Sequence, residues 1–270
     1  MTALPRSLGA LELTPTGDAS FTAGHLDGGH GVVFGGQLLA QSLLAAARVV
    51  PDKDVASLHT VFTRGATFDE PLMIEVEVLQ SGRSFSSASV SITQRRGITT
   101  QSLILLQRPD EHLIRHQDPM PEAGRPDDHA PIAHGGFWEA RIVGDVDIND
   151  PALIGPPGLM VWSRFPDAPD DLTTSQALLT YASDGFLIAT AMRPHPGFGQ
   201  ALAHVSVATT VLTQTVTFHE PFRAGEWLLL DQRSVYAGRG RSHGSANVYR
   251  EDGQLVASFT QENMVRALTR

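Results

Sequence analysis

A long apolar helix is the feature that most constrains the fold of this chain. After Gly35 and Gly36 come about four turns of strong helix formers that contain neither glycine nor proline. Apolar residues cover most of the circumference, and only four polar side chains interrupt them: Gln37, Gln41, Ser42 and Arg48. A helix on a wet surface would have a single apolar stripe. Because the following segments alternate like strands, the sequence predicts one buried helix inside a curled sheet.

Four strand-like segments follow this helix. Polar and apolar residues alternate with a period of two in residues 73–78 and 89–93. Short groups of turn-forming residues separate the segments, which favours antiparallel connections. The predicted strands are residues 57–63, 72–81, 84–94 and 99–107. One helix followed by an antiparallel meander is an α+β unit.

The N-terminal region is less regular. A short strand is predicted at residues 10–13, and a glycine-rich loop around His30 leads into the helix. Backbone N–H groups at a helix N-terminus favour an anion or a developing oxyanion. The loop is therefore either part of a site or a flexible entry segment with a solvated histidine.

The second half of the chain repeats this order of elements after a linker rich in proline, glycine and charge. Strands are predicted at residues 137–143 and 159–165. A helix is then predicted from a capping region at residues 173–175 through Asp184 to Ala189.

An internal repeat supports this division. When the chain is compared with itself at an offset of 156, nine of forty-one positions from Phe62 to Ser102 are identical. The pair Gly82-Arg83 meets Gly238-Arg239 at equivalent turns. We therefore expect an N-terminal unit at residues 1–110, a linker at 111–131 and a C-terminal unit at 132–270, with edge strands paired into one continuous sheet.

Composition excludes several classes of function. The 270-residue chain has no cysteine, which excludes disulfides, a thiol nucleophile and zinc–thiolate sites. The net charge of −9 argues against general nucleic-acid binding. The histidines have no metal-ligand spacing, and neither a metal nor a cofactor is expected. No apolar run approaches the ~18 residues of a membrane span, and the N-terminus does not resemble a signal peptide, which predicts a cytoplasmic protein.

Several motifs, taken in order along the chain, resemble the type II acyl-CoA thioesterases. They are residues 33–37 (VFGGQ), 82–86 (GRSFS), 116–121 (HQDPMP), 181–184 (YASD), 218–222 (FHEPF), 226–229 (EWLL) and 252–262 (DGQLVASFTQE). The resemblance implies a double hotdog fold, with two helix-plus-sheet units in one chain, and hydrolysis of fatty acyl-CoA to a fatty acid and CoA. It further implies an attacking water held by an Asp, a Ser or Thr hydroxyl and a Gln.

Carried onto this sequence, the Asp is Asp184 and the Gln is Gln261. Desolvation by apolar neighbours would raise the pKa of Asp184 and suit it to act as a general base, although Asp184-Gly185 is also a pattern that ends or kinks a helix. Gln261 alternates with Ala257 and Phe259, so we expect a buried amide that needs partners, as opposed to a glutamine on a strand surface.

The third member departs from the family pattern. The position of the hydroxyl falls on Val211, which cannot hydrogen-bond through its side chain. Thr209 and Thr213 lie two residues away, roughly 6.6–6.8 Å along a strand, so neither replaces the hydroxyl without a bulge or a register shift. We take Thr213 as the candidate.

Substrate contacts are expected at Gly35 and Gly36 and at two turn arginines, Arg83 and Arg239. Arg64 and Arg241 are further candidates, and each arginine has the alternative of being merely solvated. The basic pair that often follows the Ser-Phe-Ser segment in the family is here Ala88-Ser89, so one contact to the CoA phosphates is expected to be missing.

A second function stays open at this point. A hotdog protein that lost turnover through Val211 would bind acyl-CoA in a regulatory role without hydrolysing it. In either case acyl-CoA is the expected partner. The resemblance also predicts a homo-oligomer of two or more copies, which light scattering at micromolar concentration would test.

Overall fold

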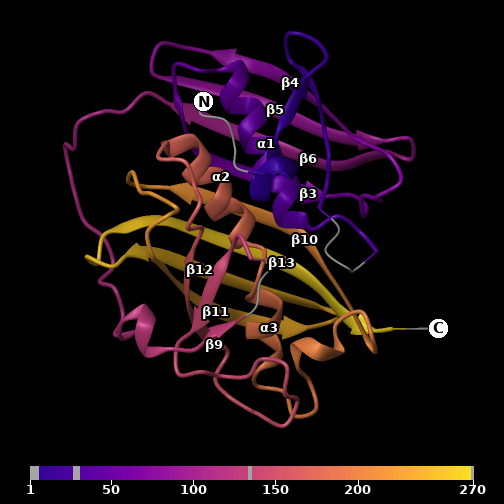
Figure 1. Ribbon diagram of the computed structural model, residues 1–270, viewed down its shortest axis with the longest axis vertical. Coiled ribbons are helices and arrows are strands. Elements are labelled where there is room, and N and C mark those ends of the chain that lie inside the picture. Colours follow the sequence, from indigo (N-terminus) through magenta and orange to yellow (C-terminus); the bar gives the residue numbers. More distant parts are fainter. Residues whose placement is uncertain (1–5, 27–30, 133–135, 269–270) are drawn as a thin grey trace.

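A single antiparallel sheet of thirteen strands forms the body of the molecule in this computed structural model, which describes residues 6–26, 31–132 and 136–268. The strand order is β1-β2-β4-β5-β6-β3-β10-β13-β12-β11-β9-β8-β7. The sheet curls around the helices, with the first half of the chain at one end and the second half at the other (Figure 1). This is the double hotdog architecture that the sequence predicts.

The first unit consists of a helix and the strands around it. Its central elements are α1 (Gly35–Val49), β3 (Asp54–Phe62), β4 (Leu72–Ser81), β5 (Phe85–Gln94) and β6 (Gly97–Gln107). The four predicted strands are thus confirmed, with ends that differ by three residues or fewer. The predicted strand at residues 10–13 is wrong, because a 3-10 helix, η1 (Arg6–Leu11), precedes β1 (Leu13–Pro15) and β2 (Ser20–Ala23).

The second unit repeats the meander with additions. It contains η2 (Pro126–Asp128), β7 (Pro131–Ile132), β8 (Glu139–Ile142), β9 (Gly158–Arg164), α2 (Leu172–Ala182), α3 (Leu187–Met192), η3 (Gln200–Leu202), β10 (Val207–Phe218), β11 (Leu228–Gly238), β12 (Arg241–Arg250) and β13 (Leu255–Ala267). Residues 108–125 form neither helix nor strand. The expected unit boundaries at residues 110 and 132 stay a prediction.

The internal repeat is visible in the strand register. A bulge lies between Val55 and Ser57 in β3, and another lies between Val211 and Thr213 in β10, at the same offset of 156 residues. The two units join where β3 pairs with β10, with Leu58 opposite Val216. This confirms that one edge strand of each unit is paired into a continuous sheet.

The helix α1 is buried as predicted, and its polar residues are satisfied locally. Gln37 and Gln41 each donate a side-chain hydrogen bond of 3.0 Å to the carbonyl oxygen of Gly24. Ser42 donates to its own helix, and Arg48 reaches the carbonyl of Leu13. A buried helix tolerates these side chains because each has such a partner.

Helices α1 and α2 cross at the centre of the molecule, and glycine permits their close approach. A Cβ atom on Gly36 would lie 2.2 Å from the carbonyl oxygen of Tyr181 in α2. On Gly35 it would lie 2.8 Å from a carboxylate oxygen of Asp184. The glycine pair is therefore required by packing between the two units, and it brings the N-terminus of α1 to Asp184.

The second helix differs from its prediction. The sequence predicts one helix through Asp184 to Ala189, but α2 ends at Ala182 and a turn at residues 183–186 separates it from α3. The hydroxyl of Ser183 donates to the carbonyl of Thr180, and the N–H of Gly185 donates to that of Ala182. A Cβ on Gly185 would lie 2.7 Å from the ring of Trp138, so the turn is also fitted to its surroundings. Asp171, and not residues 173–175, caps the start of α2 by accepting from the N–H of Thr174.

Candidate active site

Asp184 lies in the turn after α2 and is held from both units. Its Oδ2 accepts a 2.8 Å hydrogen bond from the backbone N–H of Gly36 at the N-terminus of α1. Its Oδ1 accepts a 3.0 Å hydrogen bond from Nε2 of Gln261 in β13. The sequence thus predicted correctly that Gln261 is a buried amide, and the structure shows that Asp184 is its partner.

The environment of Asp184 changes its acidity. Burial raises the pKa of its carboxyl group to about 7, although the hydrogen bonds from Gly36 and Gln261 act in the opposite direction. The carboxyl group is half-buried and lines a cavity, so solvent still reaches it. A carboxylate with this pKa can accept a proton from water near neutral pH.

The cavity beside Asp184 has a volume of about 620 Å³ and lies where the two units meet. Its apolar walls come from the start of α1, the end of β3, α3 and the start of β10, and include Leu38, Phe62, Ile188 and Val211. Polar groups at its edge include Arg64 and His204. A largely apolar cavity with a carboxylate in its wall suits a substrate with an apolar chain and one reactive polar group.

Val211 faces this cavity, and Thr213 does not lie beside Asp184. The bulge in β10 lies between them, so that Thr213 pairs with Glu262 while Gln214 pairs with the buried Gln261. Because neighbours along a strand face opposite sides, Thr213 shares the outer face with Glu262. Thr213 also does not line the cavity, whereas Thr209 and Val211 do. A nearby threonine can replace the missing hydroxyl only if the strand has a bulge. That bulge is present, but it places Thr213 on the face away from Asp184.

Comparisons with known proteins agree with this architecture. Residues 22–107 match a family model described as the acyl-CoA thioesterase N-terminal domain, and residues 115–265 match one described as the C-terminal domain. The chain belongs to the acyl-CoA thioesterase family. As a member of that family it is a thioester hydrolase.

Individual proteins resemble the chain over most of its length. An acyl-CoA thioesterase 2 of Haemophilus influenzae is 30% identical over 279 residues, covering 95% of each chain. The crystal structure of an acyl-CoA thioesterase II, TesB2, from Mycobacterium marinum has a TM-score of 0.83 and 31% identity, covering 97% of this chain and 99% of that one. A hot dog fold protein from Alicyclobacillus acidocaldarius, 18% identical with a TM-score of 0.81, shares the fold over 99% of this chain and 100% of its own.

Sequence reasoning does not find Gln214 and Ser183, two buried residues next to Gln261 and Asp184. Gln214 pairs in register with Gln261, and its Nε2 donates a 2.9 Å hydrogen bond to the hydroxyl of Ser183, next to Asp184. Both side chains are buried. The only sequence signal is a glutamine in an otherwise threonine- and valine-rich strand, and that signal gives no partner.

The predicted arginines lie in different places. Arg83 and Arg239 are exposed in the β4–β5 and β11–β12 turns, and Arg241 pairs with Glu262; none of them lines the cavity of Asp184. Arg64 does line it, and its guanidinium donates to the backbone carbonyl of Arg96.

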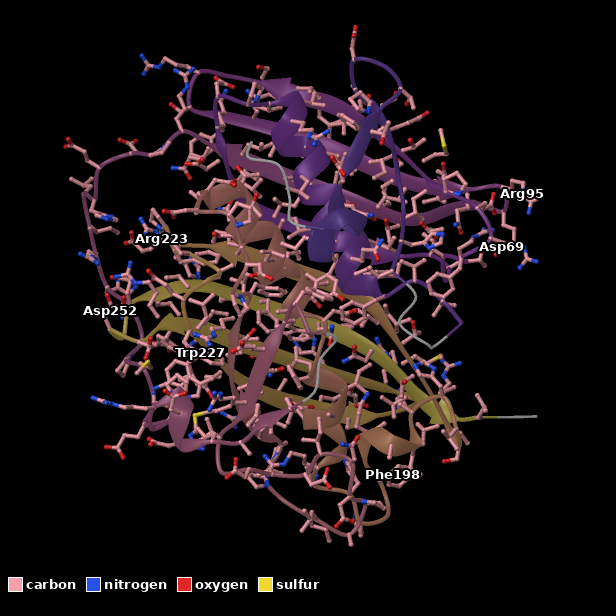
Figure 2. All side chains as sticks on the ribbon, in the orientation of Figure 1. Asp69, Arg95, Phe198, Arg223, Trp227 and Asp252 are labelled. Carbon is pink, nitrogen blue, oxygen red and sulfur yellow. The ribbon has the colours of Figure 1, made fainter. Side chains whose placement is uncertain are left out.

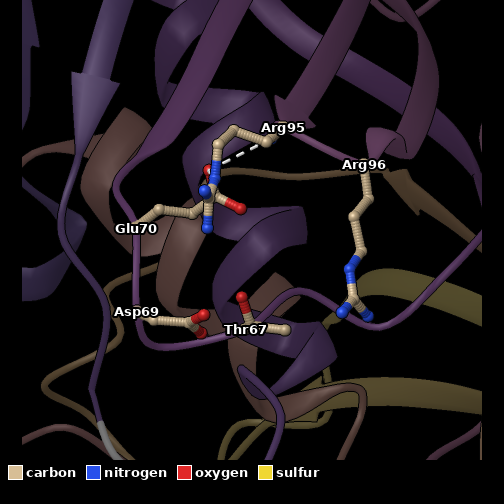
Figure 3. Close-up of a pocket in the computed structure, with 5 residues that line it drawn as sticks. All are labelled: Thr67, Asp69, Glu70, Arg95 and Arg96. Carbon is tan, nitrogen blue, oxygen red and sulfur yellow. Dashed lines mark hydrogen bonds and ion pairs between the residues drawn. The ribbon is translucent and has the colours of Figure 1, made fainter.

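A smaller pocket of about 320 Å³ lies next to Arg64, between the β3–β4 connection and the β5–β6 turn, and is lined by Thr67, Asp69, Glu70, Arg95 and Arg96. Figure 2 shows Asp69 and Arg95 together at one side of the molecule, opposite Asp252. In Figure 3, Arg95 lies against Glu70, with which it forms an ion pair of 3.1 Å, while Arg96 extends away from both. Among the described residues Arg96 forms no ion pair within 4.0 Å, although its charge helps to lower the pKa of Asp69 in the same pocket.

The remaining expectations concern the loop around His30, a metal site and a membrane span. The predicted loop around His30 lies outside the described residues. Within the described ranges, no cluster of His, Asp and Glu could hold a metal ion, and no helix is long and apolar enough to cross a membrane.

Proposed function

We propose that this protein hydrolyses fatty acyl-CoA to a fatty acid and CoA with a water activated by Asp184 and oriented by Gln261. The observation that carries the proposal is the position of Asp184, which lies in the cavity wall with hydrogen bonds from the backbone of α1 and from the side chain of Gln261. The family membership supports the thioester as the bond that is broken.

The reaction follows from the groups present. Asp184 takes a proton from the water as the water oxygen attacks the thioester carbonyl. Negative charge then develops on the carbonyl oxygen, and the N–H groups at the start of α1, beginning with Gly35, favour that charge. When the carbonyl re-forms, the C–S bond breaks and CoA leaves as the thiolate, which takes up the proton. Gly36 is committed to Asp184, so in this scheme Gly35 faces the substrate.

The two ends of the substrate differ in chemistry, and so do the surroundings of the cavity. The acyl chain suits the apolar wall that includes Leu38 and Ile188. The phosphates of CoA suit Arg64 at the cavity and Arg96 beyond it, since the Arg64 guanidinium contacts the backbone of Arg96 and both side chains are exposed. Arg83 and Arg239 are not included in this scheme because they lie away from the cavity.

Steady-state hydrolysis of a series of acyl-CoA substrates tests the catalytic assignment. Asp184→Asn and Gln261→Ala should each lower kcat by roughly 10² or more, and the double variant should lose little beyond the worse single variant. Losses that multiply would mean that the two side chains do not act on one water. Glu262→Gln, next to Gln261 but on the outer face, is the matched control and should retain full activity.

The arginine assignment is tested separately. Removing one charge-assisted contact to phosphate costs about 1.5–3 kcal/mol, so Arg64→Ala or Arg96→Ala should raise KM for acyl-CoA about 10-fold or more, with little change in kcat. Arg83→Ala serves as the control and should leave KM unchanged. Equal KM values for all three variants would place the CoA phosphates elsewhere.

Val211 supports one alternative function. Its side chain is buried at the cavity and has no hydroxyl, which is consistent with a protein that binds acyl-CoA without turning it over. Equilibrium binding of the same substrates beside the kinetic assay separates the two: tight binding without hydrolysis supports a binding protein, and hydrolysis excludes a purely regulatory role.

A further inference from the structure

The strand opposite Val211 carries a buried polar residue. In the register of β10 and β13, Val211 pairs directly with Asn263. Both side chains are buried, with 8% of Val211 and 1% of Asn263 exposed. Side chains of directly opposed residues have Cβ atoms about 4.5–5.5 Å apart. Asn263 therefore lies beside Val211 on the same face of the sheet, whereas Thr213 lies on the other face.

Asn263 is only weakly engaged by its surroundings. Its Nδ2 donates a long hydrogen bond of 3.3 Å to the hydroxyl of Ser242 in β12. Its Oδ1 is buried and accepts no hydrogen bond within the part of the chain that the structure describes. A buried acceptor without a partner costs about 1–3 kcal/mol, so this atom is placed for a ligand or a water.

Gln261 lies on the same face of β13, two residues before Asn263. Along a strand this spacing is about 6.6–6.8 Å, which leaves room for one water at about 3 Å from each amide. Gln261 uses one N–H of its Nε2 to hold Asp184, and the second N–H of that group remains for the water. The two amides thus flank the position from which Asp184 removes a proton.

We propose that Asn263 replaces the missing hydroxyl of residue 211 as the third group that holds the attacking water. This rests on the proposed function. The water donates one hydrogen bond to Asp184 and one to Oδ1 of Asn263, and it accepts one from Gln261. One lone pair is then left to attack the thioester carbonyl, and the proton that leaves the water goes to Asp184, so every hydrogen of the water has one acceptor.

The test is a set of four variants assayed on the best acyl-CoA substrate. Asn263→Ala should lower kcat about 10-fold with KM changed less than 3-fold, as expected for one hydrogen bond to the reacting water. Val211→Thr placed in the Asn263→Ala protein should restore most of that loss, because the hydroxyl returns from the opposite strand. Val211→Thr alone should change kcat less than 3-fold. Ser242→Ala removes the described partner of Asn263 and should leave kcat within 2-fold of the unaltered protein.

Three outcomes would overturn the inference. They are an unchanged kcat in Asn263→Ala, a failure of Val211→Thr to raise kcat in that background, and an equal loss in Ser242→Ala, which would make Asn263 a structural amide. If the unaltered protein hydrolyses no acyl-CoA, the proposed function fails and this inference fails with it. An active protein with an insensitive Asn263 overturns the inference alone.

A second measurement covers the case in which Asn263→Ala does not fold. A high-resolution crystal structure of the unaltered protein should contain an ordered water within about 3.2 Å of both Asn263 Oδ1 and a carboxylate oxygen of Asp184. Clear electron density without such a water would overturn the proposal.

Discussion

The two hotdog units have the same strands but different cores. In the first unit Leu58 is the second residue after the bulge in β3, and it pairs with Ile104. In the second unit the equivalent pair in β10 and β13 is Gln214 and Gln261. All four side chains are buried. One unit therefore has an apolar contact where the other has two amides at the same place in the sheet.

The helices differ in the same sense. The first unit has one unbroken α-helix, α1. Among its described residues, only the backbone N–H of Gly36 donates a hydrogen bond to Asp184. The second unit has a helix that stops at Ala182 and places Asp184 in the following turn. A buried polar group is costly unless it is paired, so chemistry and stability compete for the same core positions. The comparison indicates that the first unit contributes mainly packing, whereas the second contributes the side chains of Asp184 and Gln261 that we propose to be catalytic.

The largest effect is expected where the two units touch. Gly36→Ala would put a Cβ 2.2 Å from the carbonyl oxygen of Tyr181, and both groups belong to helix backbones that cannot move independently. We expect a loss of roughly 3 kcal/mol or more in the free energy of unfolding and of about 10²-fold or more in activity, because α1 must move away from Asp184.

The control for this prediction is Gly9→Ala. Nothing lies within 4 Å of a Cβ on Gly9, which is exposed and not in the left-handed region. Its unfolding free energy should change by no more than about 0.5 kcal/mol. Thermal unfolding of both variants checks the prediction, and a Gly36→Ala protein as stable as the control would mean that the helices are free to separate.

The fold could be predicted from the sequence to a large extent because its signals are local. Strand alternation, turn residues and the offset of 156 all lie within short segments, and they predict the meanders and their duplication. The small strands β1, β2 and β7 were missed because two to four residues carry too little pattern. The break in the second helix was expected only as an alternative at Asp184-Gly185, because Ser183 and Asp184 are stabilised by residues far away in sequence, including Gln214.

The site could be predicted only for residues that belong to a recognisable sequence motif. Asp184 and Gln261 follow from motifs, but the register of two strands decides which side chains meet them. In a regular strand Val211 and Thr213 would share a face, but the bulge in β10 places them on opposite faces. No sequence pattern predicts the position of this bulge. Asn263 became visible as the partner of Val211 only once that register was known.

Exchanging the equivalent core residues is expected to have a smaller and asymmetric effect. Leu58→Gln removes a buried apolar side chain and buries an amide without a built partner, which should cost roughly 2–4 kcal/mol. Gln214→Leu removes a buried amide whose Oε1 already has no partner among the described residues, so its cost should stay within about 1 kcal/mol.

Urea unfolding of the two single variants measures this asymmetry. The loss of the hydrogen bond from Gln214 to Ser183 should also loosen the turn that carries Asp184, and we expect kcat of Gln214→Leu to fall severalfold. Equal destabilisation by the two exchanges would contradict the view that the two cores are built differently.

The smallest effect on stability is expected from neutralising Asp184 itself. Burial raises the pKa of this carboxyl from its ordinary value of 3.8 to about 7, so the folded protein binds more protons than the unfolded chain between about pH 4 and pH 7. The protein therefore loses stability as the pH rises through this window, and Asp184→Asn removes that loss. One pKa unit corresponds to about 1.4 kcal/mol. However, the carboxyl lies in a wall that water reaches, which reduces this gain. In addition, Gly36 and Gln261 donate to different carboxylate oxygens, and asparagine replaces one of these oxygens by an NH2 group, so one of the two hydrogen bonds is lost.

We therefore expect a net gain of only about 1 kcal/mol for Asp184→Asn above pH 7, and no gain near pH 4. Thermal unfolding at a series of pH values checks this, with the exposed Asp18→Asn as the control for the loss of one charge. In the unaltered protein, kcat/KM should rise about tenfold per pH unit below about 7 and level off above it, because the base must be ionised. If the stability difference between Asp184→Asn and the unaltered protein does not vary with pH, Asp184 does not titrate in this window. The carboxylate of the second unit would then not destabilise the fold.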